Sequence, residues 1–581
     1  GMEALLKKFF TPSKKVIADK AKYPEETIQE VEERLKQCQM KIYRGLQRID
    51  KGRLGIPIYI SLYDVEGTAI TGNYKQMGKG VSDILSQASA LMELVERFSL
   101  FSFYRRAKDK GILSTFEELG DKAIPWDIFL QSVEDQEDEK TKKVSLKLLK
   151  KVPFYFVPAL EVRTKQVKYL PFHWFWLIYE YNGSAGGNTY PEASVQAICE
   201  LIERHTNALS IRINQPMPAI KRESIKGPSE ELLKCYERLG INLWIRDMTY
   251  GMPVPTIAVM AMDPSTFPER SEIVYAAGTA TSPERALIRA LTEVAQLAGD
   301  FDTEGKYVES GLPKFANLDE AKVVTDFTYE INLSDLPNLS SDNHLEELIA
   351  LSQAMKERGY EVYLIDIEEE NLKLPAVYAI IPGILFRERT VIPYLYQLVR
   401  TLSLYLSAEE NLKILEEILK EIDNKYYVWA YYGNALKALF RFDEAIIAYE
   451  KALLLEPTVP DMVALFTHLA DAYFKRGEWD KVIEVCDRAL NLGEIPELYN
   501  LLGRALYKKS DFASALQAFL RATELDPSSA IDYANAGYCL KALNLLPPAE
   551  IFFRKALALD PNLTIAKKGL EYCENILQNK N

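Results

Sequence analysis

Small and apolar residues recur at a fixed spacing in the last third of the chain. Gly503 and Gly537 lie 34 residues apart, as do Ala515 and Ala549. In three of four repeats, a small residue in one helical segment is followed by an alanine and an aromatic residue, four positions apart, in the next. This period is typical of antiparallel helix pairs that stack into a solenoid. We therefore expect helical repeats over residues 425–581, with residues 562–578 as a capping helix.

The first 405 residues have a mixed pattern. Residues 56–63 (IPIYISLY) alternate between apolar and polar positions, as a half-buried strand does. β-branched and aromatic residues predict further strands at residues 154–161, 255–262 and 360–367. Longer helical segments separate these strands, so the pattern predicts an α/β or α+β domain over residues 1–405. A charged amphipathic helix at residues 406–424 would join it to the repeats.

Composition limits the possible partners and compartment. The chain has 581 residues and a formal net charge of -13. An acidic protein of this size is not expected to bind nucleic acid through counterion release. Because we find neither a membrane-spanning apolar run nor a secretory signal, we expect a cytoplasmic protein without membrane contacts. The six cysteines form no CxxC pair, which argues against a zinc knuckle and a disulfide framework.

The most informative segment begins at the loop Gly78-Lys79-Gly80, which precedes a largely apolar helix. Within that helix, Ser89, Glu93, Glu96 and Arg97 fall at i, i+4, i+7 and i+8. These positions share one helical face. The helix therefore presents two carboxylates together although its neighbouring residues are apolar.

Two further Gly-containing loops lead into helices with the same feature. The first of these loops spans residues 182–189 and the second spans residues 277–282. The polar positions that follow them are Glu200, Glu203 and Arg204 in one helix, and Arg289, Glu293 and Gln296 in the other. Each helix alone could be an ordinary surface helix with charge pairs at i,i+4. Three such helices in one chain favour a shared site.

Elementary electrostatics suggests what such a site would hold. Several buried carboxylates without cations repel one another and cost several kcal/mol each in desolvation. Mg²⁺ takes oxygen ligands and commonly joins carboxylates to substrate phosphates. The chain has no GxxxxGK[ST] loop. The residues thus predict a metal–nucleotide site of another type.

At these residues the sequence resembles the YcaO family, over roughly residues 20–400. The resemblance implies an ATP site in which glutamates hold Mg²⁺, namely Glu93, Glu96, Glu200, Glu203 and Glu293. Of these, Glu93, Glu96 and Glu203 are the expected catalytic residues. The remaining nucleotide contacts implied are Lys20, Thr27, Lys79, Ser89, Arg97, Asn188, Arg204, Arg289 and Gln296. Lys20 and Thr27 rest on a looser alignment than the others.

The resemblance also implies a chemistry. YcaO proteins phosphorylate a peptide amide oxygen with ATP, which activates the amide carbon toward a nucleophile. A Cys, Ser or Thr side chain then gives an azoline, a sulfide source gives a thioamide, and an amine gives an amidine. This chain departs from cyclodehydratases, because it continues from residues 381–383 into the repeats instead of a Pro-rich tail. The departure favours thioamidation, or a role in ribosomal protein methylthiolation, over azoline formation.

The repeats resemble tetratricopeptide repeats (TPRs), so the expected fold is an α/β YcaO-like domain followed by an all-α TPR solenoid. We expect the array to bind the polypeptide substrate or an accessory protein, with self-association into a homodimer as the alternative. A TPR scaffold that binds ATP without catalysis, and a kinase acting on a small molecule, remain alternative functions. His205 follows Glu203 and Arg204, and we expect it to make a polar contact at the helix surface, with a general base as the alternative.

Overall fold

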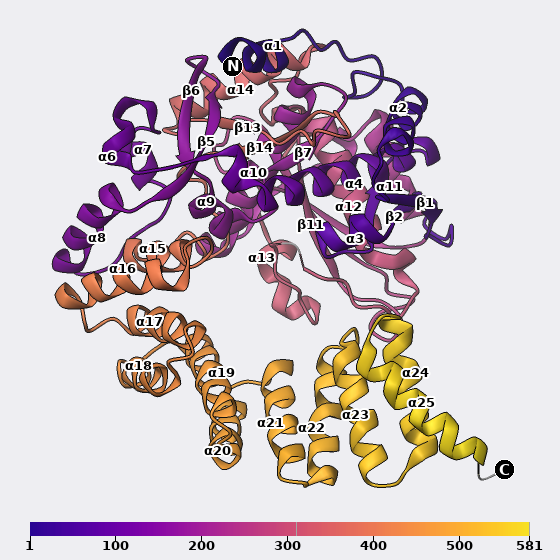
Figure 1. Ribbon diagram of the computed structural model, residues 1–581. Coiled ribbons are helices and arrows are strands. Elements are labelled where there is room, and N and C mark those ends of the chain that lie inside the picture. Colours follow the sequence, from indigo (N-terminus) through magenta and orange to yellow (C-terminus); the bar gives the residue numbers. More distant parts are fainter. Residues whose placement is uncertain (310, 580–581) are drawn as a thin grey trace. The chain divides into compact units, whose positions relative to one another are not determined.

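The computed structural model describes residues 1–309 and 311–579 of the chain. It divides into two compact units, Gly1–Tyr394 and Leu395–Asn581, each with hydrophobic clusters of its own. The first unit mixes helices and strands, whereas the described part of the second is helical (Figure 1). The predicted fold class is therefore confirmed. The units divide at Tyr394, where helix α15 (Tyr394–Leu402) begins.

The first sheet of unit 1 is antiparallel and supports helix α4 (Asp83–Arg105). Its strands follow the order β1 (Tyr43–Arg48), β2 (Ile58–Tyr63) and β3 (Lys75–Lys79). Helices α2 (Pro24–Gln37) and α3 (Val65–Thr71) pack beside α4. Because α4 buries Leu91, Leu94 and Phe98 in this cluster, its opposite side is left to carry polar residues.

The second sheet has five strands in the order β11-β10-β9-β8-β12. They are β8 (Met217–Ile220), β9 (Asn242–Asp247), β10 (Thr256–Met262), β11 (Val274–Thr279) and β12 (Phe327–Ile331). Helices α11 (Gly227–Glu237) and α12 (Pro283–Ala298) contribute Leu233 and Leu291 to the core over one face. Strands β10 and β11 are buried along their whole length, so this sheet forms the rigid support of α12.

The third sheet has six strands and supports helix α10 (Tyr190–Ile213). Five follow the order β4 (Ile112–Ser114), β5 (Phe154–Glu161), β13 (Tyr363–Asp366), β14 (Ala376–Ile380) and β7 (Ser184–Gly186), and β6 (Gln166–Pro171) pairs with β5. Helix α14 (His344–Glu357) packs on α10. The other helices of the unit are α1 (Met2–Phe9), α5 (Ala107–Lys110), α6 (Phe116–Leu119), α7 (Trp126–Leu130), α8 (Glu139–Lys151), α9 (Phe172–Tyr179) and α13 (Lys322–Thr325). The four strands predicted from the sequence are present as β2, β5, β10 and β13.

Unit 2 continues with α16 (Ala408–Glu421), which lies within the range predicted for a linking helix. The helix pairs that follow appear as stacked hairpins from orange to yellow in Figure 1. They are α17 (Tyr426–Ala438) with α18 (Phe442–Leu454), α19 (Val459–Lys475) with α20 (Trp479–Leu490), α21 (Pro496–Lys508) with α22 (Phe512–Leu525), and α23 (Ala530–Ala542) with α24 (Leu546–Leu559). The capping helix is α25 (Thr564–Asn579).

The repeated small residues allow the two helices of a pair to touch. A Cβ atom added to Gly503 would lie 2.8 Å from the ring of Phe519, and one added to Gly537 would lie 2.8 Å from the ring of Phe553. The aromatic residue thus fills the space that the glycine leaves. This contact is the physical reason for the 34-residue pattern seen in the sequence.

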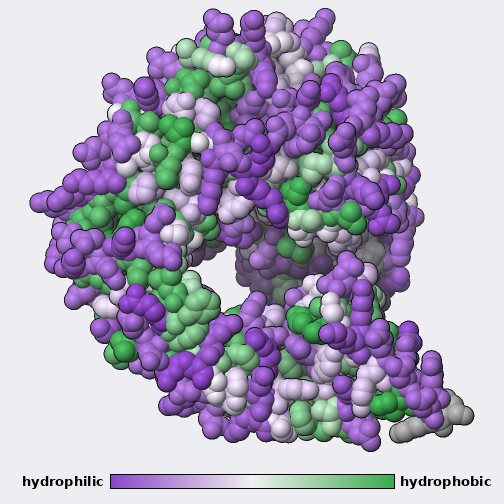
Figure 2. Space-filling model, in the orientation of Figure 1, coloured by the Kyte–Doolittle hydropathy of each residue, from purple (hydrophilic) through white to green (hydrophobic). Residues whose placement is uncertain are grey.

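Hydrophilic side chains predominate on the face shown in Figure 2, and hydrophobic ones appear there as small separate patches. Among the described residues, no helix is long and apolar enough to cross a membrane.

Candidate functional site

Three strand–loop–helix segments of unit 1 share one local construction. Strands β3, β7 and β11 each lead through a short loop into a long helix, α4, α10 or α12. The side chains of Ser82, Thr189 and Ser282 accept hydrogen bonds from the backbone N–H three residues later, at 3.3, 3.1 and 3.2 Å. Such caps satisfy N–H groups that the first turn leaves free. Each helix therefore starts in the same register from its cap.

The polar residues of these helices occupy matching positions. Counted from the cap, position 7 holds Ser89, Gln196 and Arg289, position 11 holds Glu93, Glu200 and Glu293, and position 14 holds Glu96, Glu203 and Gln296. Positions 7, 11 and 14 share one helical face. A common register thus directs one glutamate from every helix to an equivalent place.

Two glycines allow the strands to lie against their own helices. A Cβ atom on Gly78 would lie 2.1 Å from the backbone nitrogen of Ala90, and one on Gly278 would lie 2.4 Å from that of Ala290. No side chain fits at either position. The close approach places the strand ends beside the polar helix face, where the Lys79 N–H donates to Ser89 Oγ at 3.2 Å.

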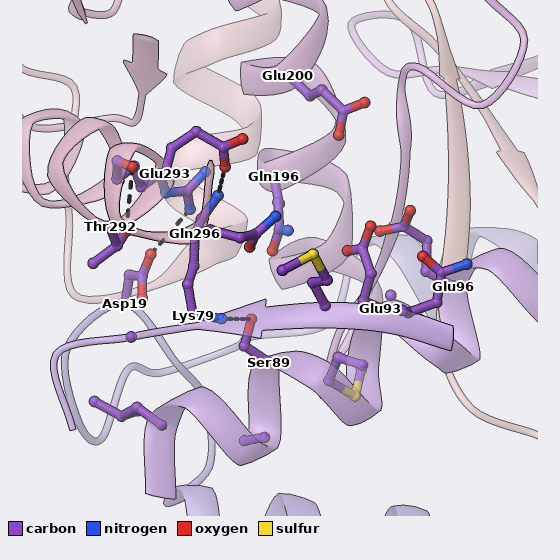
Figure 3. Close-up of a pocket in the computed structure, with 18 of the residues that line it drawn as sticks. Asp19, Lys79, Ser89, Glu93, Glu96, Gln196, Glu200, Thr292, Glu293 and Gln296 are labelled. Atoms are coloured by element: carbon purple, nitrogen blue, oxygen red, sulfur yellow. Dashed lines mark hydrogen bonds and ion pairs between the residues drawn. The ribbon is translucent and has the colours of Figure 1, made fainter. Parts of the chain in front are cut away.

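The three polar faces line one cavity of about 660 Å³. This volume lies within the usual range of small-molecule sites. Glu93 and Glu96 lie on one side of the close-up, and Asp19, Thr292 and Glu293 lie on the other (Figure 3). The structure brings all fourteen residues expected from the sequence to this cavity: Lys20, Thr27, Lys79, Ser89, Glu93, Glu96, Arg97, Asn188, Glu200, Glu203, Arg204, Arg289, Glu293 and Gln296.

Arg97 links the carboxylates at one side of the cavity. Its Nε donates to Glu96 at 2.9 Å, and another nitrogen lies 3.2 Å from Glu93. The guanidinium lies 4.0 Å from the ring centre of Tyr181. Burial and the charge of Glu93 raise the pKa of Glu96 well above its usual value, and burial also raises the pKa of Glu200. These carboxylates are therefore costly to keep ionised without a further cation.

The other two helices give their glutamates different surroundings. Burial raises the pKa of Glu203 to about 7, although Arg204 lies 3.7 Å away and opposes the shift. Burial would also raise the pKa of Glu293, but contact with Lys79 lowers it below its usual value. Glu293 is thus held as an anion, whereas Glu203 can gain or lose a proton near neutral pH.

Arginine and amide groups form the remaining wall. Arg289 donates to Asp19 at 3.0 Å. Thr27 Oγ1 donates to Asn188 Oδ1 at 2.8 Å, and the Asn188 backbone N–H donates to Glu192 at 2.8 Å. These contacts join the segment before α2 to α12, and α2 to the loop that leads into α10.

The donor set of the cavity fits a divalent cation together with an anionic ligand. Among the described residues, no three His, Cys, Asp or Glu side chains lie close enough to form a ready metal site. The glutamates contact Arg97, Arg204 and Lys79 instead. Mg²⁺ favours carboxylate and phosphate oxygens, and lysine and arginine bind phosphates through charge-assisted hydrogen bonds. Both partners of an Mg²⁺–polyphosphate ligand would therefore find matching groups here.

The sequence-based prediction missed several polar residues of the cavity. Matching the caps would have found Gln196, because it shares the register of Ser89 and Arg289. Glu192 has the spacing of a capping-box residue from Thr189, a signal for a helix start and not for a site. Among the residues that were missed are Asp19, Glu192, Gln196 and Arg285. For Asp19 the sequence offers no comparable signal.

The expectation that His205 lies at the helix surface is wrong. Its side chain is buried, and its Nδ1 accepts a hydrogen bond from the Leu385 N–H at 3.0 Å. Burial lowers its pKa to about 4, and the charge of Arg212 adds to this. In the described part of the cavity wall, His205 does not take part. It ties α10 to the segment after β14.

Comparison with known proteins identifies the class to which this fold and cavity belong. The YcaO family, described as YcaO cyclodehydratase, ATP- and Mg²⁺-binding, matches residues 77–385. Tetratricopeptide repeats match residues 426–459, 464–498 and 496–529. The chain belongs to the YcaO family, and it carries a TPR array after the YcaO domain.

Individual relatives are distant. An uncharacterised protein of Methanothermobacter thermautotrophicus is 25% identical over 378 residues, which are 62% of this chain and 94% of that protein. The ribosomal protein S12 methylthiotransferase accessory factor YcaO of Escherichia coli is 25% identical over 241 residues, covering 39% of this chain and 40% of that protein. A solved heterocyclase in complex with substrate and cofactor has a TM-score of 0.54 at 23% identity, covering 68% of this chain and 57% of its own. The chain thus spans about half the length of the latter two, and the heterocyclase likeness is one of fold.

Proposed function

We propose that unit 1 binds ATP with Mg²⁺ and uses it to phosphorylate the oxygen of a peptide backbone amide. The observation that carries this proposal is the shared register of Glu93, Glu200 and Glu293, which face one cavity from three equally capped helices. A set of buried and half-buried carboxylates beside arginines has no evident structural use, because it costs free energy that apolar residues would not.

The glutamates and the arginines of the cavity would bind different parts of the ligand. Glu93, Glu96, Glu200, Glu203 and Glu293 would hold Mg²⁺, which would neutralise charge on the phosphates. Arg97, Arg204 and Arg289 would bind the phosphate oxygens once the glutamates and Asp19 release them. Lys20, Thr27, Lys79, Ser89, Asn188 and Gln296 would complete the nucleotide contacts. Positioning and charge neutralisation are the main requirements for phosphoryl transfer.

The reaction balances without a covalent enzyme intermediate. The amide oxygen would take the terminal phosphoryl group, and ADP would leave. A nucleophile would then add to the activated carbon, and phosphate would depart with the former amide oxygen. Before Mg²⁺ binds, Glu203 can hold a proton near neutral pH, because burial raises its pKa to about 7, and Mg²⁺ would displace that proton.

We favour thioamidation, or a role beside a ribosomal protein methylthiotransferase, over azoline formation. The E. coli relative is named as an accessory factor of such an enzyme. In this chain, the segment after the YcaO domain leads into α15 and the TPR helices. The array would recruit the polypeptide substrate or an accessory protein, as its repeats offer an extended surface.

Isotope transfer tests the proposed chemistry. A peptide substrate would first be sought by comparing, by mass spectrometry, the peptides of a strain with and without the gene. That peptide, labelled with ¹⁸O at the amide, should then give ¹⁸O-labelled phosphate with the full chain, ATP and Mg²⁺. Unlabelled phosphate in the presence of modified peptide would contradict amide phosphorylation. A phosphorylated product that keeps its phosphate would indicate a kinase.

A non-catalytic ATP-binding scaffold is the second candidate, because each of the three helices has a glutamate that already pairs with a cation of the protein: Glu93, Glu203 and Glu293. It predicts nucleotide binding without turnover. Measuring phosphate release with the identified peptide separates the two.

A further inference from the structure

A segment before α2 forms part of the cavity wall although it precedes the region matched by the family. Ala18, Asp19, Lys20 and Lys22 line the cavity, whereas the match begins at residue 77. The segment is tied to the start of α14: the His344 N–H donates to the Ser13 carbonyl at 2.9 Å. Its path along the cavity is therefore fixed by backbone contacts.

Asp19 is held by its main chain on one side and by its carboxylate on the other. Nε2 of His344 lies 2.7 Å from the Asp19 carbonyl oxygen, so this nitrogen is the donor. Two residues on, the Ala21 N–H donates to Glu192 at 2.7 Å. The carboxylate accepts from Arg289 at 3.0 Å, and Figure 3 shows it reaching into the cavity below Thr292. The side chain can consequently leave Arg289 without disturbing the backbone.

Three cations, Lys20, Arg285 and Arg289, line the same small pocket as the Asp19 carboxylate. Burial would raise the pKa of Asp19, but the charges of Lys20, Arg289 and Arg285 together hold it well below its usual range. Within the described residues, the side chains of Lys20 and Arg285 make no hydrogen bond or ion pair, and both line the cavity. The cluster therefore carries more positive charge than Asp19 compensates.

The neighbouring carboxylates are engaged elsewhere. Glu347 pairs with Lys15 at 2.9 Å and accepts from Thr281 at 2.5 Å. Glu192 accepts from the backbone N–H groups of Ala21 and Asn188. Neither carboxylate therefore pairs with Lys20 or Arg285 in place of Asp19. The side chains of Lys20 and Arg285 line the cavity.

We propose that Asp19 is the internal anion of the cations Lys20, Arg285 and Arg289 of the nucleotide site, and that a bound polyphosphate replaces Asp19 on Arg289. This inference rests on the proposed function in taking a nucleotide as the ligand. A guanidinium N–H that donates to a carboxylate cannot donate equally to a phosphate oxygen. Asp19 thus keeps Arg289 in place in the free protein and lowers the affinity of these cations for anions.

The test measures binding by calorimetry with the full chain. Asp19→Asn keeps the shape of the side chain but removes its charge, so it should bind Mg²⁺–ATP and inorganic tripolyphosphate about tenfold more tightly than the wild type, as expected for one charge-assisted hydrogen bond released. Arg285→Gln should bind both about tenfold more weakly. Asp50→Asn is the matched control, because Asp50 pairs with Arg48 outside the cavity and should leave both affinities unchanged.

The outcomes separate this inference from the proposed function. Equal or weaker binding of tripolyphosphate by Asp19→Asn would overturn it, since Asp19 would then only support Arg289. Thermal melting adds a readout that a supporting role would not produce: tripolyphosphate should raise the melting temperature of Asp19→Asn by more than it raises that of the wild type. If wild type binds tripolyphosphate but not Mg²⁺–ATP, the proposed function fails while the role of Asp19 stands.

Discussion

The glutamates that line the cavity differ in pKa although they share one chemical group. Glu293 is kept ionised by Lys79, whereas burial brings the pKa of Glu203 to about 7. A carboxylate whose folded pKa exceeds its unfolded value of 4.5 opposes folding when ionised. This cost is absent below pH 4.5, grows as the pH rises, and is complete above about pH 7. The ionised Glu203 side chain therefore lowers the stability of the ligand-free protein, and a bound cation would offset this cost.

Replacing Glu203 by Gln should stabilise the ligand-free protein and inactivate it. The amide keeps the shape but has no charge to desolvate, so Glu203→Gln should raise the melting temperature at pH 8 and leave it nearly unchanged at pH 5. ATP hydrolysis should fall by at least about a hundredfold, because the metal loses a ligand. Calorimetric melting and phosphate release are the measurements.

Glu361→Gln provides the comparison. Glu361 is buried and pairs with Arg163 at 2.9 Å outside the cavity. Its loss leaves a charge without a partner and should lower the melting temperature while hydrolysis persists. A Glu203→Gln protein that melts lower at pH 8, or that still hydrolyses ATP, would show that Glu203 is a structural residue.

At the scale of elements, the site residues lie on three capped helices, and each helix packs on strands of a different sheet. Helix α4 packs on β3, α12 on β11, and α10 on β14 and β7. Gly78 and Gly278 make two of these contacts close enough to fix the polar face against the strand end. The position of each glutamate thus depends on how tightly strand and helix approach.

Gly78→Ala tests this dependence. The added Cβ would lie 2.1 Å from the Ala90 nitrogen, so α4 must shift. We expect a loss of about 2 kcal/mol or more in unfolding free energy, from overpacking, and a marked loss of ATP affinity. Gly305→Ala is the control, because its Cβ would meet only Thr303 Oγ1 at 3.4 Å. Unfolding by urea that shows equal stability for both variants would contradict a close strand–helix contact.

Helix periodicity explains why the sequence located so much of this site. Ser89, Glu93 and Glu96 share one face of α4, and the other residues of this helix are largely apolar. Because the apolar residues pack into the core, the shared polar face is expected to line a cavity. Helix periodicity does not show, however, which segments far apart in the sequence come into contact. Asp19 reaches Arg289 from a segment 270 positions away, and His205 is buried because the segment after β14 packs over it. Such contacts depend on tertiary packing that a single sequence pattern does not encode.

At the scale of the whole molecule, a nucleotide cavity and a helical array belong to one chain. A glycine and an aromatic ring interlock within a repeat, as Gly503 and Phe519 do. Neighbouring repeats also pack on one another, as α22 does on α23. None of the fourteen predicted site residues lies in it. Binding of ATP and recruitment of a polypeptide are therefore expected to be separable.

Removing residues 425–581 tests this separation. If the array recruits the substrate or an accessory protein, basal ATP hydrolysis should survive the deletion, and stimulation by the polypeptide should fall by about tenfold or more, because effective concentration is lost. Steady-state hydrolysis with and without polypeptide measures both. If the mass by light scattering drops instead while stimulation persists, the array serves self-association.

The central claim is that the three carboxylate helices bind ATP through Mg²⁺. Calorimetric titration of the full chain with ATP, first with Mg²⁺ and then with a chelator, addresses it directly. We predict binding that weakens at least about tenfold without Mg²⁺, and a Glu93→Gln variant that binds equally weakly under both conditions, since its site has lost a metal ligand. Equal affinity of the wild type with and without Mg²⁺ would contradict the account.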